Sequence, residues 1–268
     1  MRDNDGKTTP IPAPDAALRP HRARGVRPLE VTPPQARPPS SRSTLADDVY
    51  RQLRDLIVAL KLSPGTPLSE SDLTVRLGVS RTPIREALQR LHREGFAVVQ
   101  HVGTISRMLV APMTIEDMRE LHGILSALEG LAARAAAQLP DADRSALASR
   151  MADVNRQLRA AWKAGPQRVR DAQDLHVQFH RAFAEAAAGP RLRAELDAVQ
   201  PQVERYERVY TAALGSEFGE SLTEHELIVA AIDSGNADEA ERAVVTNWRR
   251  GTERYAQIVH HLGERGSW

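Results

Sequence analysis

The first periodic pattern of hydrophobic and polar positions begins after Thr44. Apolar residues then recur at steps of three and four, the spacing of one face of an α-helix. These residues are Leu45, Val49, Leu53, Leu56 and Leu60. Thr44 is a suitable N-cap, and Pro64 with Gly65 cannot continue the helix. The pattern therefore predicts an amphipathic helix that begins after Thr44 and ends before Pro64.

Two shorter helices are predicted next, separated by a glycine turn. Ser69 is the expected N-cap of a helix over residues 70–77, and Gly78 follows it as the turn. Ser80 is the expected N-cap of the next helix, which Gly95 ends. The inward stripe of that helix consists of Ile84, Leu88 and Leu91. Two short helices joined by a tight turn are typical of a helix-turn-helix.

The rest of the chain divides into a short β-rich stretch and a long helical part. Residues 96–110 are interrupted at Gly103, which predicts a two-stranded wing. After Pro112, Pro and Gly breaks separate predicted helices over 114–139, 141–164, 167–188, 191–214, 219–234 and 237–262, with a kink at Pro201. Long helices with short connections pack as an antiparallel bundle. The predicted fold class is mainly α, an N-terminal winged helix-turn-helix followed by an all-α antiparallel bundle.

The composition restricts the cellular compartment of the protein and the kinds of binding site that it can form. The 268 residues suffice for two domains, and the net charge of +1 gives no global basicity, so a DNA-binding surface must come from local clustering. The absence of cysteine excludes disulfides and thiolate metal sites. No apolar run reaches the ~20 residues of a membrane span, and prolines stand where a signal core would lie. We expect a cytoplasmic protein without a membrane partner.

Residues 1–43 form a tail of different composition. They contain nine prolines and seven arginines but few apolar side chains, so they cannot offset the entropy lost on ordering. The sequence predicts a disordered segment. Its positive charge is either a weak attraction for phosphate or simply the charge of a solvated tether.

The stretch from Ser80 to Leu88 has the chemistry of a DNA-reading helix. Ser80 and Thr82 lie at the helix N-terminus, where hydroxyls and N–H groups can bind phosphate. Arg81 and Arg85 are one turn apart on the face opposite the apolar stripe, and their planar forks suit guanine. We expect Arg90 to contact a phosphate or to pair with Glu86 or Glu94. A solvated arginine face is the alternative, which the adjoining helix, turn and wing disfavour.

The run from Leu68 to Leu91, LSESDLTVRLGVSRTPIREALQRL, closely resembles the winged-helix domain of GntR-family regulators. With the helical remainder, the resemblance extends over residues 44–262 and indicates the FadR-like branch with an FCD effector domain. It implies a homodimer on a palindromic double-stranded operator, controlled by a small-molecule effector. It also implies that Arg81 and Arg85 read the DNA and that His101 and Gly103 belong to the wing tip. The expected domains are a tail (1–43), a DNA-binding domain (44–112) and an effector-binding and dimerisation domain (113–268).

Polar residues on buried stripes mark the second domain. His176 and His180 are i, i+4 neighbours on one predicted helix, a spacing that lets two imidazoles bind one metal. His225 and Asn247 lie on the apolar stripes of two later helices. Inward imidazoles must be hydrogen-bonded or bound to a metal.

The FCD resemblance implies a metal set of one Asp, a His four residues later, and two further His. Here His180 and His225 match two ligand positions, whereas His176 stands at the Asp position and Asn247 at the last His position. Three imidazoles with an amide oxygen could still hold Zn²⁺ or Ni²⁺. Two alternatives stay open: a polar pocket without metal, and core histidines with no ligand.

A second departure concerns the effector. The family commonly has an Arg four residues before Glu129, where it pairs with a carboxylate ligand, and this chain has Leu125 there. An organic acid is therefore a less secure effector. His122, Leu125 and Arg181 are the candidate effector-site residues. Two rival functions are a ligand-independent DNA binder and a metal hydrolase with Glu185 or Glu226 as base; we expect no enzyme activity.

Overall fold

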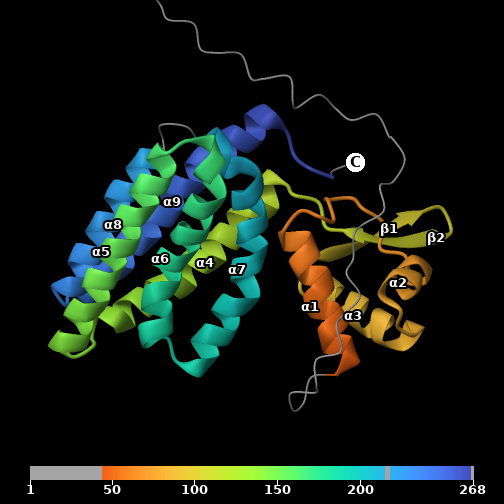
Figure 1. Ribbon diagram of the computed structural model, residues 1–268, viewed down its shortest axis with the longest axis horizontal. Coiled ribbons are helices and arrows are strands. Elements are labelled where there is room, and N and C mark those ends of the chain that lie inside the picture. Colours follow the sequence, from red (N-terminus) through yellow and green to blue (C-terminus); the bar gives the residue numbers. More distant parts are fainter. Residues whose placement is uncertain (1–43, 215–217, 267–268) are drawn as a thin grey trace, which may run out of the picture. The chain divides into compact units, whose positions relative to one another are not determined.

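The computed structural model describes residues 44–214 and 218–266, so the predicted N-terminal tail lies outside the described part. Helices α1 (Leu45–Val58), α2 (Glu70–Leu77) and α3 (Arg81–Arg93) precede strands β1 (Ala97–Val102) and β2 (Ile105–Val110) (Figure 1). The strands pair antiparallel, with Ala97 opposite Val110 and Val102 opposite Ile105. This is the predicted winged helix-turn-helix.

The turn of the wing explains the glycine in it. The register leaves Gly103 and Thr104 as a two-residue loop, and Gly103 has a φ of +59°. Two-residue hairpins need a positive φ, which glycine adopts without steric cost. The prediction that the wing turns at Gly103 is confirmed.

Helix α1 is shorter than its apolar pattern. It begins after Thr44 as predicted but ends at Val58. Leu60, which continues the three-four spacing, has a φ of +58°, and the amide of Leu62 donates to the carbonyl of Leu56. The chain thus turns back at the helix end and buries Leu62. Apolar spacing cannot distinguish this capping turn from one more helical turn.

The second part of the chain is a bundle of six long helices within the described residues. They are α4 (Ile115–Ala137), α5 (Asp141–Lys163), α6 (Val169–Ala187), α7 (Pro190–Tyr210), α8 (Phe218–Asp233) and α9 (Ala237–Leu262), with 3-10 turns at Pro166–Arg168 and Thr211–Ala213 (Figure 1). Helix α7 includes Pro201 and gives way to the 3-10 turn after Tyr210, whereas a helix to residue 214 was predicted.

Helix α4 occupies the centre of the bundle and packs against α6, α7, α8 and α9. Its contact with α9 is the closest: a Cβ added to Gly130 would lie 3.3 Å from side-chain atoms of Glu241 and Val245. Ala132, Ala133 and Ala136 are completely buried. Small residues let the two backbones approach, so polar side chains on α4 and α9 meet inside the bundle. None of the helices in residues 44–214 and 218–266 combines the length and the apolarity needed to cross a bilayer.

Candidate nucleic-acid interface and histidine site

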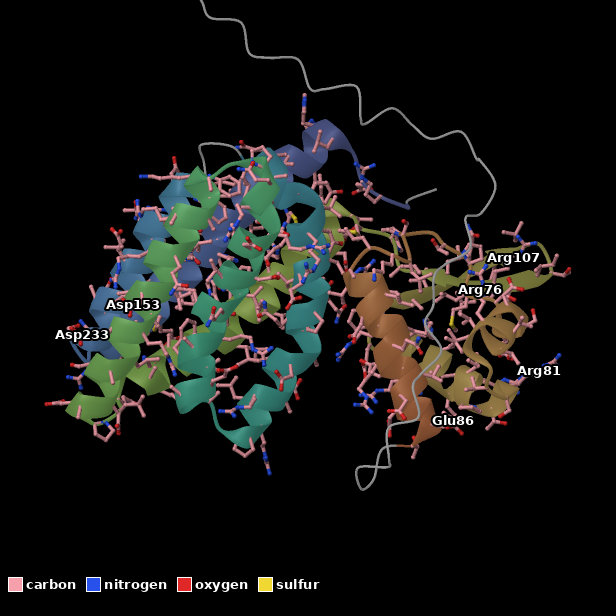
Figure 2. The ribbon with its side chains drawn as sticks, in the orientation of Figure 1. Arg76, Arg81, Glu86, Arg107, Asp153 and Asp233 are labelled. Carbon is pink, nitrogen blue, oxygen red and sulfur yellow. The ribbon has the colours of Figure 1, made fainter. Side chains whose placement is uncertain are left out.

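The outer face of α3 carries the residues predicted to read DNA. Ile84, Leu88 and Leu91 are buried, which leaves Arg81, Thr82 and Arg85 exposed on the opposite side. Arg81 extends away from the protein in Figure 2. Ser80 is the N-cap but makes no side-chain capping hydrogen bond. The hydroxyl of Ser80 and the first N–H groups of α3 are therefore available to an anion.

Arg85 is held by a carboxylate of the preceding helix. Its Nε and an Nη each donate to Glu70 over 3.0 Å. The hydrogen bond with Arg85, more than the partial burial that opposes it, lowers the pKa of Glu70. Both charges remain accessible to solvent. The pair orients the guanidinium on the outer face of the domain.

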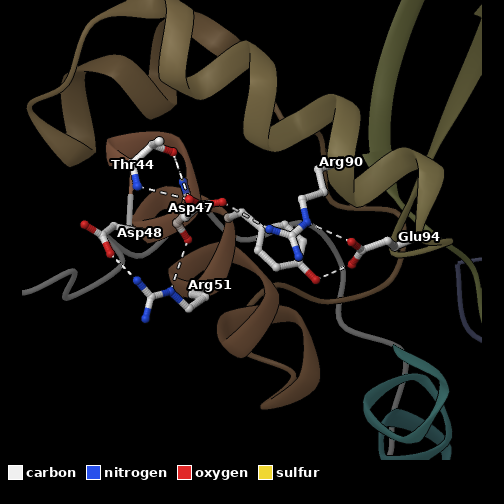
Figure 3. Close-up of polar contacts among 7 residues, drawn as sticks. Thr44, Asp47, Asp48, Arg51, Arg90 and Glu94 are labelled. Atoms are coloured by element: carbon white, nitrogen blue, oxygen red, sulfur yellow. Dashed lines mark hydrogen bonds and ion pairs between the residues drawn. The ribbon is translucent and has the colours of Figure 1, made fainter. Parts of the chain in front are cut away.

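Arg90 has a different environment from Arg81 and Arg85. Its guanidinium carbon lies 3.7 Å from the centre of the Tyr50 ring, and its nitrogens contact Glu94 at 2.8 Å and Asp47 at 3.3 Å (Figure 3). The Tyr50 hydroxyl also donates to Glu94. Asp47 completes the capping box of α1 with Thr44. Arg90 therefore joins α3 to the first helix of the domain.

The wing carries polar side chains at its tip. His101 and Ser106 lie opposite each other in the ladder, and their side chains are hydrogen-bonded over 2.8 Å. His101, Gly103 and Arg107 are exposed, and Figure 2 shows Arg107 on the wing. The wing thus presents the side chains of His101 and Arg107 to solvent.

In the bundle, three of the predicted metal residues come together. One ring nitrogen each of His176, His180 and His225 lies within 4.8 Å of the others. The first two project from α6 at i, i+4, as the sequence predicts, and His225 faces them from α8. His180 and His225 are almost fully buried. Burial lowers the pKa of His225 well below its usual value, so this ring is neutral and has one nitrogen lone pair.

The ring nitrogens Nδ1 of these histidines are anchored by other helices. Nδ1 of His180 lies 2.7 Å from Glu129 of α4, whose same oxygen accepts from the indole of Trp248. Nδ1 of His225 lies 3.0 Å from the side-chain oxygen of Asn155, whose amide nitrogen donates to a backbone carbonyl. Both acceptors require an Nδ1–H on the histidine. The lone pairs therefore lie on Nε2, and both Nε2 atoms are buried without a hydrogen-bond partner.

His176 has a carboxylate partner on α7. Its Nδ1 lies 3.3 Å from Glu207 Oε1, an ion-pair contact without hydrogen-bond geometry. Burial lowers the pKa of His176, but the attraction of Glu207 outweighs it and the net shift is upward. Burial likewise raises the pKa of Glu207, and the charge of His176 reverses that shift. Without a metal these two buried groups attract each other as opposite charges, and His176 would release its proton on binding a cation.

This donor set fits a divalent metal. Metal-binding histidines commonly use one ring nitrogen for the ion and donate the other N–H to a carboxylate or amide, as His180 and His225 do. Unpartnered buried nitrogens are costly, and a cation would satisfy them.

The other predicted effector and metal residues occupy different surroundings. Asn247 and His122 line the same small cavity as His176. Leu125 is completely buried in the hydrophobic core. Arg181 is exposed, is paired with Glu185 and Asp197, and lines a separate cleft of about 280 Å³ whose wall includes Glu129 and His180.

Sequence reasoning missed Glu207, Asn155 and Thr252, whose hydroxyl lies 3.0 Å from Nδ1 of His122. Two of these residues had a signal in the sequence. Glu207 lies on the stripe of Val203 and Tyr210, and Asn155 on that of Met151 and Leu158, so a polar residue on a buried stripe marks them.

Comparison with known proteins identifies the family. Residues 45–105 match the bacterial regulatory proteins of the gntR family, and residues 120–250 match the FCD domain. The chain belongs to the GntR family. It is a DNA-binding transcription regulator whose DNA binding is modulated by a small ligand in the FCD domain.

Individual relatives agree with this GntR assignment. The chain is 30% identical over 201 residues, 73% of its length and 84% of the relative's, to a probable D-xylose utilization operon transcriptional repressor of Paenarthrobacter nicotinovorans. It is 42% identical over 77 residues to an HTH-type transcriptional regulator in an unstable DNA locus of Streptomyces ambofaciens, a match that covers 28% of this chain and 32% of that protein.

Solved structures share the fold. The E. coli protein McbR/YncC aligns with a TM-score of 0.61 at 20% identity, over 81% of this chain and 99% of that one. A putative GntR regulator from Rhodococcus sp. RHA1 aligns with a TM-score of 0.58 at 23% identity, over 80% and 97%. These likenesses concern the arrangement of the helices and the wing.

Proposed function

We propose that this GntR regulator binds a palindromic operator as a homodimer and that a divalent metal in the histidine site belongs to its effector pocket. Ser80, Arg81, Thr82 and Arg85 of α3 would contact the major groove, with His101 and Gly103 at the wing tip. The exposure of these residues on one face supports this assignment. Arg90 would act through its packing on Tyr50.

The observation that carries the metal proposal is the pair of buried Nε2 lone pairs of His180 and His225. His176 would be the third ligand, and Asn247, whose side-chain oxygen remains available, a fourth. When bound, Zn²⁺ or Ni²⁺ would supply a Lewis-acidic centre that an oxygen of the effector can approach. The charge also fits, since Glu129 and Glu207 are buried carboxylates within this site.

Ligand control would follow from a shift between two arrangements of the two DNA-binding domains in the dimer. An effector changes operator affinity only as far as it binds one arrangement more tightly than the other. The relative named as a probable repressor of a D-xylose utilization operon supports repression as the mode of control. We place the protein in the cytoplasm, where it would meet its operator.

Selection of binding sites from a random duplex library, followed by anisotropy titrations, tests the DNA proposal. The selected sites should be inverted repeats, and analytical ultracentrifugation should give a dimer. Elemental analysis of the purified protein tests the metal: we expect about one ion per chain, lost in a His180→Ala, His225→Ala double variant. If the protein selects inverted repeats but contains no metal, only the metal part of the proposal is rejected.

Two rival functions have separate tests. A ligand-independent DNA binder would give the same footprint with and without effector. A metal hydrolase would turn over an ester or phosphoester with added Zn²⁺. The acids suggested for that chemistry, Glu185 and Glu226, are exposed and paired with Arg181 and Arg159, which does not favour a catalytic base.

A further inference from the structure

A small cavity lies beside the histidine site. It has a volume of about 20 Å³, enough for one water-sized group. Its polar lining includes His122, His176, Glu207, Ser221 and Asn247, which belong to five different helices, and Arg254 of α9. A group placed there would touch most of the bundle at once.

His122 presents a hydrogen-bond acceptor to this cavity. Its Nδ1 lies 3.0 Å from the hydroxyl of Thr252, and that hydroxyl donates its only proton to the carbonyl of Trp248. His122 must therefore donate from Nδ1, which leaves a lone pair on Nε2. The Nε2 atom is buried without a hydrogen-bond partner, and the residue is 1% exposed.

The other polar atoms of the lining add further acceptors. Glu207 Oε1 is also buried: it lies 3.3 Å from Nδ1 of His176 but has no hydrogen bond, and the residue is 3% exposed. The amide nitrogen of Asn247 donates to Glu224 at 2.8 Å and to Ser221 at 3.4 Å, which leaves the oxygen of Asn247 for the metal ion. A ligand group that satisfies this lining must donate hydrogen bonds.

Positive charge at the cavity is already paired. Arg254 is the one arginine among the described residues of the lining, and both ends of its guanidinium contact Glu224, at 3.0 and 3.1 Å. Leu125 is completely buried at the position where an arginine would pair with a carboxylate. A carboxylate ligand would therefore face the carboxylate of Glu207 and the lone pair of His122, with no free arginine to receive it.

A divalent metal does not reverse this preference. Its two positive charges balance the two negative charges of Glu129 and Glu207, the buried carboxylates that contact His180 and His176. The metal-loaded site is then close to neutral. A carboxylate would add an uncompensated buried charge, whereas an uncharged ligand would not.

We infer that the cavity between His122 and Glu207 receives a hydroxyl group of an uncharged effector, so that this regulator responds to an alcohol or polyol rather than to a carboxylate. The inference rests on the proposed effector pocket. The hydroxyl donates to His122 or Glu207 and accepts, in turn, from a donor such as Ser221. A ligand larger than the cavity must displace the helices that line it, which couples binding to the conformation of the bundle.

The test uses the full-length, Zn²⁺-loaded protein and calorimetric titration with matched pairs of ligands. Each pair has one carbon skeleton: propylene glycol with lactate, glycerol with glycerate, and xylitol with xylonate. We expect at least one alcohol to bind about tenfold or more tightly than its carboxylate counterpart, the ratio expected for one unsatisfied buried polar group. Equal affinities, tighter binding of the carboxylates, or no binding of any alcohol would overturn the inference.

Two variants connect the preference to the cavity. His122→Phe keeps an aromatic ring but removes the acceptor, and should weaken alcohol binding about three- to tenfold. Glu207→Gln removes the charge and adds donors, and should shift the preference towards the carboxylates. Glu226→Gln, an exposed carboxylate on α8, is the control and should change neither affinity. Unchanged alcohol affinity in both cavity variants would overturn the assignment.

The wild-type comparison decides the question even if a variant does not fold. Operator affinity without ligand, measured in parallel, keeps the two proposals separate. Loss of inverted-repeat binding would reject the proposed regulator. Intact operator binding with tighter carboxylate binding would reject only the effector class.

Discussion

Glu70 of α2 and Arg85 of α3 form a bidentate ion pair in which both nitrogen–oxygen distances are 3.0 Å. The pair links the two helices of the helix-turn-helix through the residue expected to read a base. A guanidinium that is already oriented by one carboxylate loses less conformational freedom when it meets guanine. Glu70 is thus a positioning residue for recognition.

Arg85→Ala should weaken operator binding roughly 5- to 150-fold and relax the preference at one base pair, because a bidentate base contact carries that discrimination. Glu70→Gln should keep most of the affinity while broadening the base preference at the same position. Anisotropy titrations against single-base operator variants measure both effects. Glu86→Gln, an exposed carboxylate on the same helix (Figure 2), is the matched control. Wild-type affinity of Arg85→Ala would show that this arginine does not contact DNA.

Arg90→Ala should act mainly on stability. The variant loses the contact with the Tyr50 ring and the ion pairs with Glu94 and Asp47 (Figure 3). Because the side chain is partly exposed, we expect a loss of only about 1 kcal/mol in the free energy of unfolding. Urea denaturation measures it, with Arg93→Ala as an exposed control on the same helix. A variant of unchanged stability but much weaker DNA binding would instead make Arg90 a direct DNA contact.

His122 should make the metal-free protein sensitive to acid. Burial lowers the pKa of His122 to about 4, from an ordinary value of 6.5. As the pH falls between these values the unfolded chain binds the proton first, so the free energy of unfolding decreases. Relative to His122→Phe, wild type should lose about 1.4 kcal/mol per pH unit within that window. Parallel pH dependence of the two proteins in thermal denaturation would contradict the low pKa.

Trp248 should report metal binding by its fluorescence. Its indole donates to the Glu129 oxygen that also contacts His180, and its ring lies 5.2 Å from that imidazole. Ni²⁺ quenches nearby indoles, so titration with Ni²⁺ should reduce the emission, and Trp248→Phe should remove most of the change. Trp162, which stacks on Phe218, remains as the internal control. Equal quenching in wild type and Trp248→Phe would place the ion elsewhere.

Local patterns were sufficient for most of the fold. The caps at Thr44 and Ser69, the turn at Gly78 and the hairpin at Gly103 are determined by short-range backbone chemistry, and the structure has all four. The ends of α1 and α7 are exceptions: at the end of α1, Leu60 fits the helical stripe but adopts a left-handed conformation, and α7 gives way to a 3-10 turn after Tyr210. The spacing of apolar residues predicts which face of a helix is buried. It does not predict the backbone angles at the end of the helix.

The sequence by itself determined the helix-turn-helix, the helical bundle and the i, i+4 pair of His176 and His180, because each depends on residues within a few positions of one another. The partners of those histidines depended on the tertiary structure. Glu129, Asn155 and Glu207 come from three other helices, and only packing brings their oxygen atoms within 3.3 Å of an imidazole nitrogen. Packing also fixes which nitrogen keeps the lone pair, since the acceptor that receives each Nδ1–H lies far away along the chain.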